Sequence, residues 1–305
     1  MPDVNLSFYA LTHVRASVYV ILTALFLQHS TVLRLFTNDA GRGKFDGVVF
    51  ALWCILAASF SLFLAVKPIR QDLKYHNFAD GRSLRLCGCA KVQNWQNVLS
   101  NVPFLVGCAV GLVTLQDNRI PFVSEWERDV GWPTLFVGIG LVSFGSAYYH
   151  WSPSNATLAW DRAPMTIAFM SLISILMEER MGEYFRQEHG IAIGSITIFP
   201  FIAIGLSSVI YWHCYDDLRP YVVIGLFLPM LVAPLIMLTF EGKYTGNGHQ
   251  LCGAAWYLLA KVCEEFDKQI YAATSEAVSG HTLKHLFASL ITFQLSYMLL
   301  TRSFA

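Results

Sequence analysis

The stretch from Ile191 to Trp212 reads IAIGSITIFPFIAIGLSSVIYW and contains no charged residue. A bilayer hydrocarbon core about 30 Å thick is crossed by roughly 20 helical residues, so this run is long enough to span a membrane. Apolar runs of the same kind occur on both sides of it. The chain is therefore predicted to be an all-α, polytopic transmembrane helical bundle.

The composition of the whole chain agrees with this class. Of its 305 residues, 55% are hydrophobic and 14% are charged, whereas soluble domains carry roughly a quarter charged residues. The mean hydropathy is +0.47. Basic and acidic residues number 21 each, so no excess positive charge indicates a nucleic-acid partner. These values exclude a disordered chain, a nucleic-acid binder and most soluble enzymes.

The apolar runs predict three regions along the chain. Residues 1–66 are expected to form one or two extra N-terminal membrane helices, 67–95 a polar loop segment at the face of the site, and 96–305 a seven-helix membrane domain. The candidate spans are Ala16–Phe36, Gly47–Val66, Val98–Leu115, Trp132–Tyr149, Met165–Met177, Ile191–Trp212, Tyr221–Phe240, Leu251–Val262 with a polar continuation to Tyr271, and Thr282–Leu300.

Polar residues that can carry chemistry lie at the ends of three of these spans. Ionisable groups are costly at membrane depth, and they are usually functional or paired there. Ser146 and His150 are four residues apart, as are His281 and His285, so each pair lies on one face of its helix. Asp161 stands at the entrance to the next span, near a helix N-terminus that favours a carboxylate.

Counting the crossings places His150, Asp161, His281 and His285 at the same face of the membrane. Three neutral imidazoles with one open position form a catalytic zinc arrangement. Taken singly, each motif has a plainer interpretation: a pair of interfacial histidines, a serine that packs between helices, or a capping aspartate.

At these residues the sequence resembles the alkaline ceramidase family. That family belongs to a wider seven-helix hydrolase superfamily that includes progestin/adiponectin-type receptors and GPI-lipid-remodelling factors. The shared pattern is S-x-x-x-H, then an Asp, then H-x-x-x-H near the C-terminus. Four segments are also similar to bacterial-type members, and the resemblance covers roughly residues 67–301; the segments are Tyr75–Arg82, Asn94–Asn101, Trp160–Met165 and Gly280–His285.

The resemblance implies hydrolysis of ceramide, or of a related sphingolipid amide, to a sphingoid base and a free fatty acid. It implies that His150, His281 and His285 hold Zn²⁺. Asp161 would then act as general acid and base, and Ser146 would donate a hydrogen bond to the developing oxyanion. The implied partners are a ceramide-like lipid and the bilayer itself.

Calcium is a second cofactor that the resemblance raises. Animal members carry an acidic calcium site before the first helix of the core, but here Asp80 is accompanied by the basic residues Arg82 and Lys91. These cations argue against calcium activation. Asp80, Asn97 and Asn101 are the candidate oxygen donors.

Other functions stay open at this stage. A progestin/adiponectin-type receptor would keep the zinc site, although only five residues follow Leu300 to carry a signal. A GPI-type lipid-remodelling hydrolase would share the chemistry, and a transporter would use the histidines as a proton relay. The expected location is an integral, multi-pass position in the endoplasmic reticulum or Golgi of a eukaryote, or in the plasma membrane of a bacterium.

The orientation rests on basic residues in the segment 67–95, which place the site face in the cytoplasm by the positive-inside rule. The sequon at Asn155 would argue the reverse if it were glycosylated.

Two further charge clusters have structural interpretations. Glu178–Arg180 is expected to be a solvated boundary on the opposite face, and the cluster from Lys261 to Asp267 an ion-pair set at the interface rather than a headgroup contact.

Overall fold

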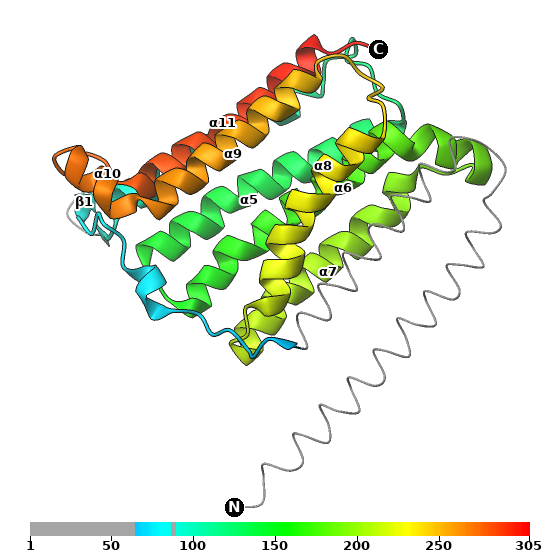
Figure 1. Cartoon of the computed structure of the whole chain (residues 1–305). Helices are drawn as coiled ribbons and strands as arrows, with labels where there is room; N and C mark the ends of the chain where they lie inside the picture. The colour runs from blue at the N-terminus through cyan, green and yellow to red at the C-terminus, as the bar shows by residue number, and fades with distance from the viewer. Residues whose placement is uncertain (1–64, 87–89) are drawn as a thin grey trace, which may run out of the picture. The chain divides into compact units, whose positions relative to one another are not determined.

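The computed structural model describes residues 65–86 and 90–305 (Figure 1). The chain divides into two units between Leu64 and Ala65. The predicted spans Ala16–Phe36 and Gly47–Val66 fall almost entirely in the first unit, which lies outside the described residues. They therefore stay predictions.

The described residues form a bundle of long helices with one short antiparallel hairpin, in which Arg85 stands opposite Lys91. A 3₁₀ turn, η1, precedes the hairpin, and π-helical turns, η2 and η3, lead into two of the helices. The elements are η1 (Leu73–His76), β1 (Leu84–Leu86), β2 (Ala90–Val92), α3 (Trp95–Leu99), α4 (Val102–Thr114), η2 (Glu127–Gly131), α5 (Trp132–Trp151), α6 (Asn155–His189), α7 (Ile193–Tyr215), η3 (Tyr221–Phe227), α8 (Leu228–Thr239), α9 (Asn247–Glu265), α10 (Asp267–Ala273) and α11 (Gly280–Thr301).

Five stretches of helix in the described residues are long and apolar enough to cross a membrane. The multi-pass membrane character predicted from the sequence is therefore confirmed. Helices α6 and α9 occupy the other two predicted spans of the core but are more polar, so the count of seven stays a prediction. The five stretches are Trp95–Thr114, Glu127–Trp151, Ile193–Tyr215, Tyr221–Thr239 and Gly280–Thr301.

The packing of the helices brings the last one, α11, beside α4. Helix α4 packs against both α5 and α11, α5 packs against α6, and α6 packs against α7 and α8. Helices α9 and α11 run side by side (Figure 1). This order places the N-terminal end of α11 near the C-terminal end of α5, where the predicted site residues lie.

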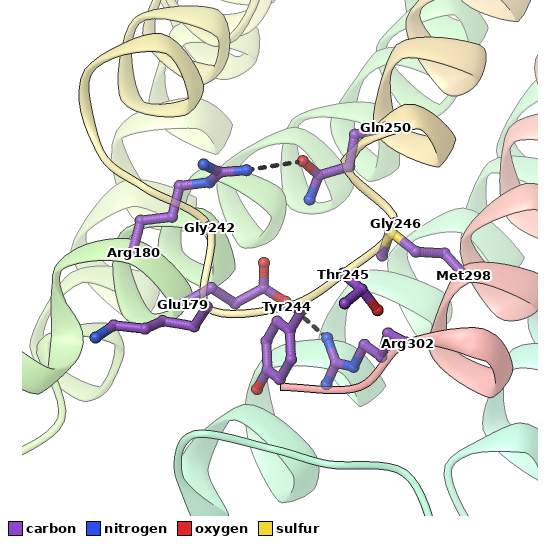
Figure 2. A pocket seen from close by; sticks show the side chains of 10 residues that line it. Glu179, Arg180, Gly242, Tyr244, Thr245, Gly246, Gln250, Met298 and Arg302 are labelled. Carbon is purple, nitrogen blue, oxygen red and sulfur yellow. Dashed lines mark hydrogen bonds and ion pairs between the residues drawn. The ribbon is translucent and has the colours of Figure 1, made fainter. Parts of the chain in front are cut away.

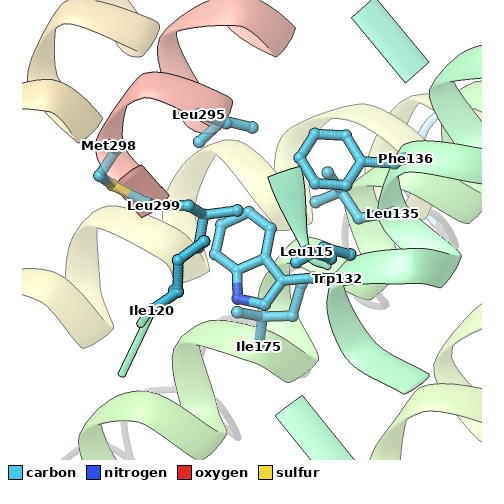
Figure 3. Close-up of a cluster of buried hydrophobic side chains, with 9 residues drawn as sticks. All are labelled: Leu115, Ile120, Trp132, Leu135, Phe136, Ile175, Leu295, Met298 and Leu299. Atoms are coloured by element: carbon cyan, nitrogen blue, oxygen red, sulfur yellow. The ribbon is translucent and has the colours of Figure 1, made fainter. Parts of the chain in front are cut away.

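A buried apolar cluster holds α5, α6 and α11 together (Figure 3). Trp132 and Phe136 of α5 are fully buried, and they contact Ile175 of α6 and Leu299 of α11 within the cluster. A buried aromatic side chain removes a large apolar area from solvent and so dominates local packing energy. The cluster fixes the relative positions of the three helices that carry the site.

A buried ion network lies at the other end of α11. Arg302 donates to Glu127 at 2.7 Å and to Glu179 at 2.8 Å, and the Tyr244 hydroxyl donates to Glu127 at 2.7 Å. Figure 2 shows Arg302 beside Glu179 in the small pocket that these residues line. The expectation that Glu178–Arg180 is a solvated boundary was wrong, because all three residues are buried. Glu179 pairs with Arg302 from beyond α11, Glu178 pairs with Arg186 of its own helix, and Arg180 donates to oxygens of α8, α9 and Phe240.

Candidate metal centre and adjoining cavity

Three histidines from two helices meet at one end of the bundle. His150 comes from the last turn of α5, and His281 and His285 from the first two turns of α11. One ring nitrogen from each lies within 4.8 Å of the others. All three side chains are buried, and His150 is fully so. This triad, predicted from span parity and spacing, could hold a metal ion.

A close approach between helices sets the position of His281. A Cβ atom on Gly280 would overlap the carbonyl oxygen of Cys263 and lie 2.7 Å from the Cα of Asp267, so only glycine fits there. This contact brings the start of α11 against the junction of α9 and α10. The Asp267 carboxylate then accepts a hydrogen bond from the backbone N–H of His281 at 2.7 Å.

A hydroxyl group orients the ring of His285. The Oγ atom of Ser100 lies 2.7 Å from Nδ1 of His285 and donates its own proton to the carbonyl of Asn97 at 3.0 Å. Because a hydroxyl has one proton to give, the Ser100 oxygen accepts from Nδ1–H. That leaves the Nε2 lone pair of His285 free, which is the state a metal ligand requires.

The hydrogen bonding of the His150 ring shows whether the site suits a metal. Among the described residues, neither ring nitrogen of His150 has a hydrogen-bond partner, although the side chain is buried. Buried polar atoms in native proteins are nearly always paired, and leaving one unpaired costs about 1–3 kcal/mol. A cation between the three imidazoles would satisfy one of the two unpaired nitrogens of His150, so the donor set fits a metal such as Zn²⁺.

An aromatic side chain from the polar segment covers the triad. The ring of Phe78 lies 4.6 Å from that of His150 and 4.8 Å from that of His281, measured between centroids. The next residue, Ala79, is fixed to the bundle because its N–H donates to the second carboxylate oxygen of Asp267 at 2.8 Å. Asp267 thus holds both the His281 backbone and the segment that covers the three histidines.

His76 is part of the same segment and ends the 3₁₀ turn η1. Its Nδ1 lies 2.9 Å from the Tyr149 hydroxyl, and its Nε2 lies 2.9 Å from Oδ1 of Asn155. Both ring nitrogens are therefore engaged with protein groups. The sequon residue Asn155 uses its carbonyl oxygen to anchor this segment.

Ser146 and Asp161 come together on neighbouring helices. A Cβ atom on Gly145 would overlap the backbone carbonyl oxygen of Trp160. The backbones of α5 and α6 therefore approach closely here, and the absence of a side chain on Gly145 permits it. As a result, the Ser146 hydroxyl is within interaction range of the Asp161 carboxylate. Both residues line the same cavity as His285.

That cavity has a volume of about 400 Å³ and opens between α4, α5, α6, α9 and α11. Ligand pockets of roughly 300–1,000 Å³ are typical of small-molecule sites. Most of its wall is apolar, including Phe104, Leu135, Ile139, Phe169, Leu172 and Leu295. Its polar lining includes Ser146, Asp161, Arg162, Glu264, Lys284 and His285. An amphipathic ligand with a long apolar part matches this division.

A charged group in the cavity wall joins α9 to α11. Lys284 donates to Glu264 at 2.5 Å, and Lys261 donates to the other oxygen of Glu264 at 2.8 Å. The pair on α9 follows the predicted i,i+3 spacing. No role for Lys284 or Ser100 could be predicted from the sequence, because their partners lie on other helices and no local spacing relates them.

Two of the three candidate calcium donors are occupied by protein groups, whereas the buried side-chain oxygen of Asn101 has no hydrogen-bond partner among the described residues. Both carboxylate oxygens of Asp80 accept from the Arg82 guanidinium, at 2.8 and 2.9 Å. The side-chain oxygen Oδ1 of Asn97 accepts from the Thr282 hydroxyl at 2.8 Å. The oxygens of Asp80 and Asn97 therefore serve internal hydrogen bonds.

Comparison with known proteins adds no relative: no protein-family model and no curated protein matches this chain. The function is therefore inferred from the site itself.

Proposed function

We propose that this protein is a zinc-dependent membrane hydrolase that cleaves the amide bond of ceramide or a related sphingolipid amide. The observation that carries the proposal is a group of three buried histidines, one of which, His285, lines a largely apolar cavity together with Ser146 and Asp161. The resemblance to the alkaline ceramidase family at these same residues supports the choice of reaction.

His150, His281 and His285 would hold the metal. A zinc ion in such a site supplies Lewis-acid polarisation of a carbonyl and acidification of water. The apolar wall of the cavity binds the lipid chain and directs the amide toward the histidines. The covering ring of Phe78 limits the access of bulk water to this end of the cavity.

Asp161 and Ser146 carry the proton and hydrogen-bond steps. Asp161 accepts the proton of the attacking water and passes it to the leaving amine, as a carboxylate in a cleft can. The Ser146 hydroxyl donates to the developing oxyanion, and the loss of one such donor costs about 10²–10³ in rate. We therefore expect Ser146→Ala to be slow and Asp161→Asn to be close to inactive.

The proposal is tested on the full chain purified in detergent. Zinc content and fatty-acid release from a panel of ceramides are measured for the wild type and His281→Ala. The matched control is His249→Ala, since His249 lies on α9 and bonds Gln294 rather than the triad. We expect one zinc ion and turnover in the wild type and the control, and neither in His281→Ala.

Two results would overturn this proposal in different ways. Zinc without turnover on any ceramide would favour a receptor, or a related lipid-remodelling hydrolase with another substrate. A folded wild type that binds no zinc would remove the metal centre and return the histidines to a structural role.

A further inference from the structure

Arg162 is a buried cation in the wall of the cavity. It follows Asp161 near the start of α6, and only 7% of its surface is exposed. It lines the cavity together with Gln71 and Tyr221. A charged side chain so far from solvent needs compensation from its surroundings.

The side chains that contact the Arg162 guanidinium are neutral, and the carboxylate of Asp161 acts on it only electrostatically, beyond ion-pair distance. Its guanidinium carbon lies 4.1 Å from the Trp212 ring centroid and 4.6 Å from that of Tyr221. One terminal nitrogen, Nη2, donates to the side-chain oxygen Oε1 of Gln71 at 2.8 Å. The other, Nη1, is buried and has no acceptor among the described residues.

A second buried arginine in this chain has its charge balanced by carboxylates, although its Nε also lacks a hydrogen-bond partner among the described residues. Arg302 forms ion pairs with Glu127 at 2.7 Å and Glu179 at 2.8 Å. Within residues 65–86 and 90–305, Arg162 has no carboxylate at ion-pair distance. The charge of Arg162 is therefore available to a ligand, unlike that of Arg302, and so is its unpaired Nη1.

The other charges of the cavity leave an excess of positive charge. Lys261 and Lys284 share one carboxylate, that of Glu264. With Arg162 and Asp161 included, the wall carries three cations and two carboxylates. A bound metal cation would add to this excess, so an anionic ligand is better matched to the cavity than a neutral one.

We propose that Arg162 forms an anion-binding subsite in the cavity and that, among the lipid amides open to the proposed hydrolase, it prefers those whose polar end carries an acidic group, such as a carboxylate, over neutral ones such as ceramide itself. A guanidinium binds carboxylate and phosphate oxygens through parallel N–H donors, and the apolar wall takes the acyl chain. The subsite stands on geometry alone, whereas the assignment of its ligand as a substrate rests on the proposed hydrolase function.

The test compares ligands that share one acyl chain. N-palmitoylglycine carries a carboxylate, N-palmitoylethanolamine is its neutral counterpart, and palmitate is the acid that hydrolysis would release. Binding to the full chain in detergent is measured by calorimetry for the wild type and for Arg162→Gln, which removes the charge. Arg162→Lys keeps the charge but lacks the parallel N–H donors of a guanidinium. Arg119→Gln is the control, because it removes the charge of an exposed arginine.

All binding measurements are repeated in the His281→Ala background, so that a carboxylate held by the metal is distinguished from one held by Arg162. Each variant is first checked for an unchanged gel-filtration profile. We expect N-palmitoylglycine to bind at least about tenfold more tightly than N-palmitoylethanolamine, because a hydrogen bond to a charged group is strong. This preference should persist in His281→Ala, shrink in Arg162→Lys and vanish in Arg162→Gln.

Equal affinity for the acid and the neutral amide, or an equal loss of both in Arg162→Gln, would overturn the subsite. Arg162-dependent binding of palmitate without that of N-palmitoylglycine would keep the subsite and overturn its assignment to the substrate. Arg162-dependent binding in a protein without turnover would keep the subsite and count only against the hydrolase function.

Discussion

The carboxylate of Asp267 accepts a hydrogen bond from the backbone N–H of His281 at 2.7 Å and, through its second oxygen, one from Ala79 at 2.8 Å. One side chain thus ties a proposed metal ligand to the segment that covers it. Such supporting contacts typically change metal affinity by about 10–100-fold when they are lost.

We therefore expect Asp267→Ala to weaken zinc binding by about tenfold and to lower the melting temperature. Zinc affinity is measured by competition with a chelator of known affinity. Asp129→Ala is the control, since Asp129 pairs with the neighbouring Arg128 at the surface. Unchanged zinc affinity in Asp267→Ala would show that the backbone of His281 is held by other contacts.

Ser100 gives a second prediction, because its hydroxyl accepts from Nδ1–H of His285 and so keeps Nε2 unprotonated. Ser100→Ala removes this acceptor and is expected to weaken zinc binding by about 10–100-fold. Ser100→Thr retains the hydroxyl and should stay near the wild type. Ser289→Ala is the matched control, since Ser289 is buried on α11 but bonds only the Leu286 carbonyl of its own helix.

The contact at Gly145 gives a third prediction. Alanine there would force its Cβ into the Trp160 carbonyl and separate α5 from α6. Overpacking of this kind costs about 1–3 kcal/mol, and turnover should fall further because Asp161 moves away from Ser146. Both are measured, by thermal unfolding and by fatty-acid release.

The control for this change is Gly253→Ala on α9. A Cβ at Gly253 would meet Ile291 at an ordinary 3.7 Å, and alanine is favoured over glycine inside a helix. Gly253→Ala should therefore be neutral or slightly stabilising. An equally mild effect of Gly145→Ala would mean that the helices can adjust without loss.

The ion network around Arg302 gives a fourth prediction. Arg302→Met would leave the carboxylates of Glu127 and Glu179 buried without a cation, and breaking a buried ion pair in this way costs about 3–5 kcal/mol. Adding Glu127→Gln to this variant should restore part of the loss. Arg119→Met, which breaks an exposed pair with Asp117, should show no measurable change in thermal unfolding.

The Asp80–Arg82 pair gives a prediction for pH. Burial by itself would raise the pKa of the Asp80 carboxyl, but the hydrogen bonds and charge of Arg82 outweigh it and hold the pKa below its ordinary value. A carboxyl with a lowered folded-state pKa stabilises the fold fully above its unfolded pKa of about 3.9. That stabilisation is lost as the pH falls through the lower, folded-state value.

Asp80→Asn should therefore unfold at a lower temperature than the wild type at pH 7, and the difference should shrink as the pH falls below about 4. Arg82→Gln should flatten the same part of the curve. A difference in melting temperature that does not depend on pH would show that the pair contributes packing rather than charge.

Much of the fold could be predicted from the sequence, because it depends on local properties. A run such as Ile191–Trp212 has no charged side chain and must satisfy its backbone groups within a helix, so its class follows from composition and length. The motif spacing of His150, His281 and His285, with the number of crossings between them, predicted that the three lie at one membrane face, and the resemblance implied that they hold one metal ion. The N-terminal spans lie outside the described residues and were not tested.

The interactions around the site were decided only by the tertiary structure. Whether Glu179 meets Arg302, or Ser100 meets His285, depends on the rotation of each helix about its axis and on how closely helices approach. Residues such as Gly145 and Gly280 set that approach through contacts with distant backbone. The sequence alone thus determined the helices and the candidate ligands. Helix packing determined which buried polar groups find partners, and it leaves Nη1 of Arg162 without an acceptor among the described residues.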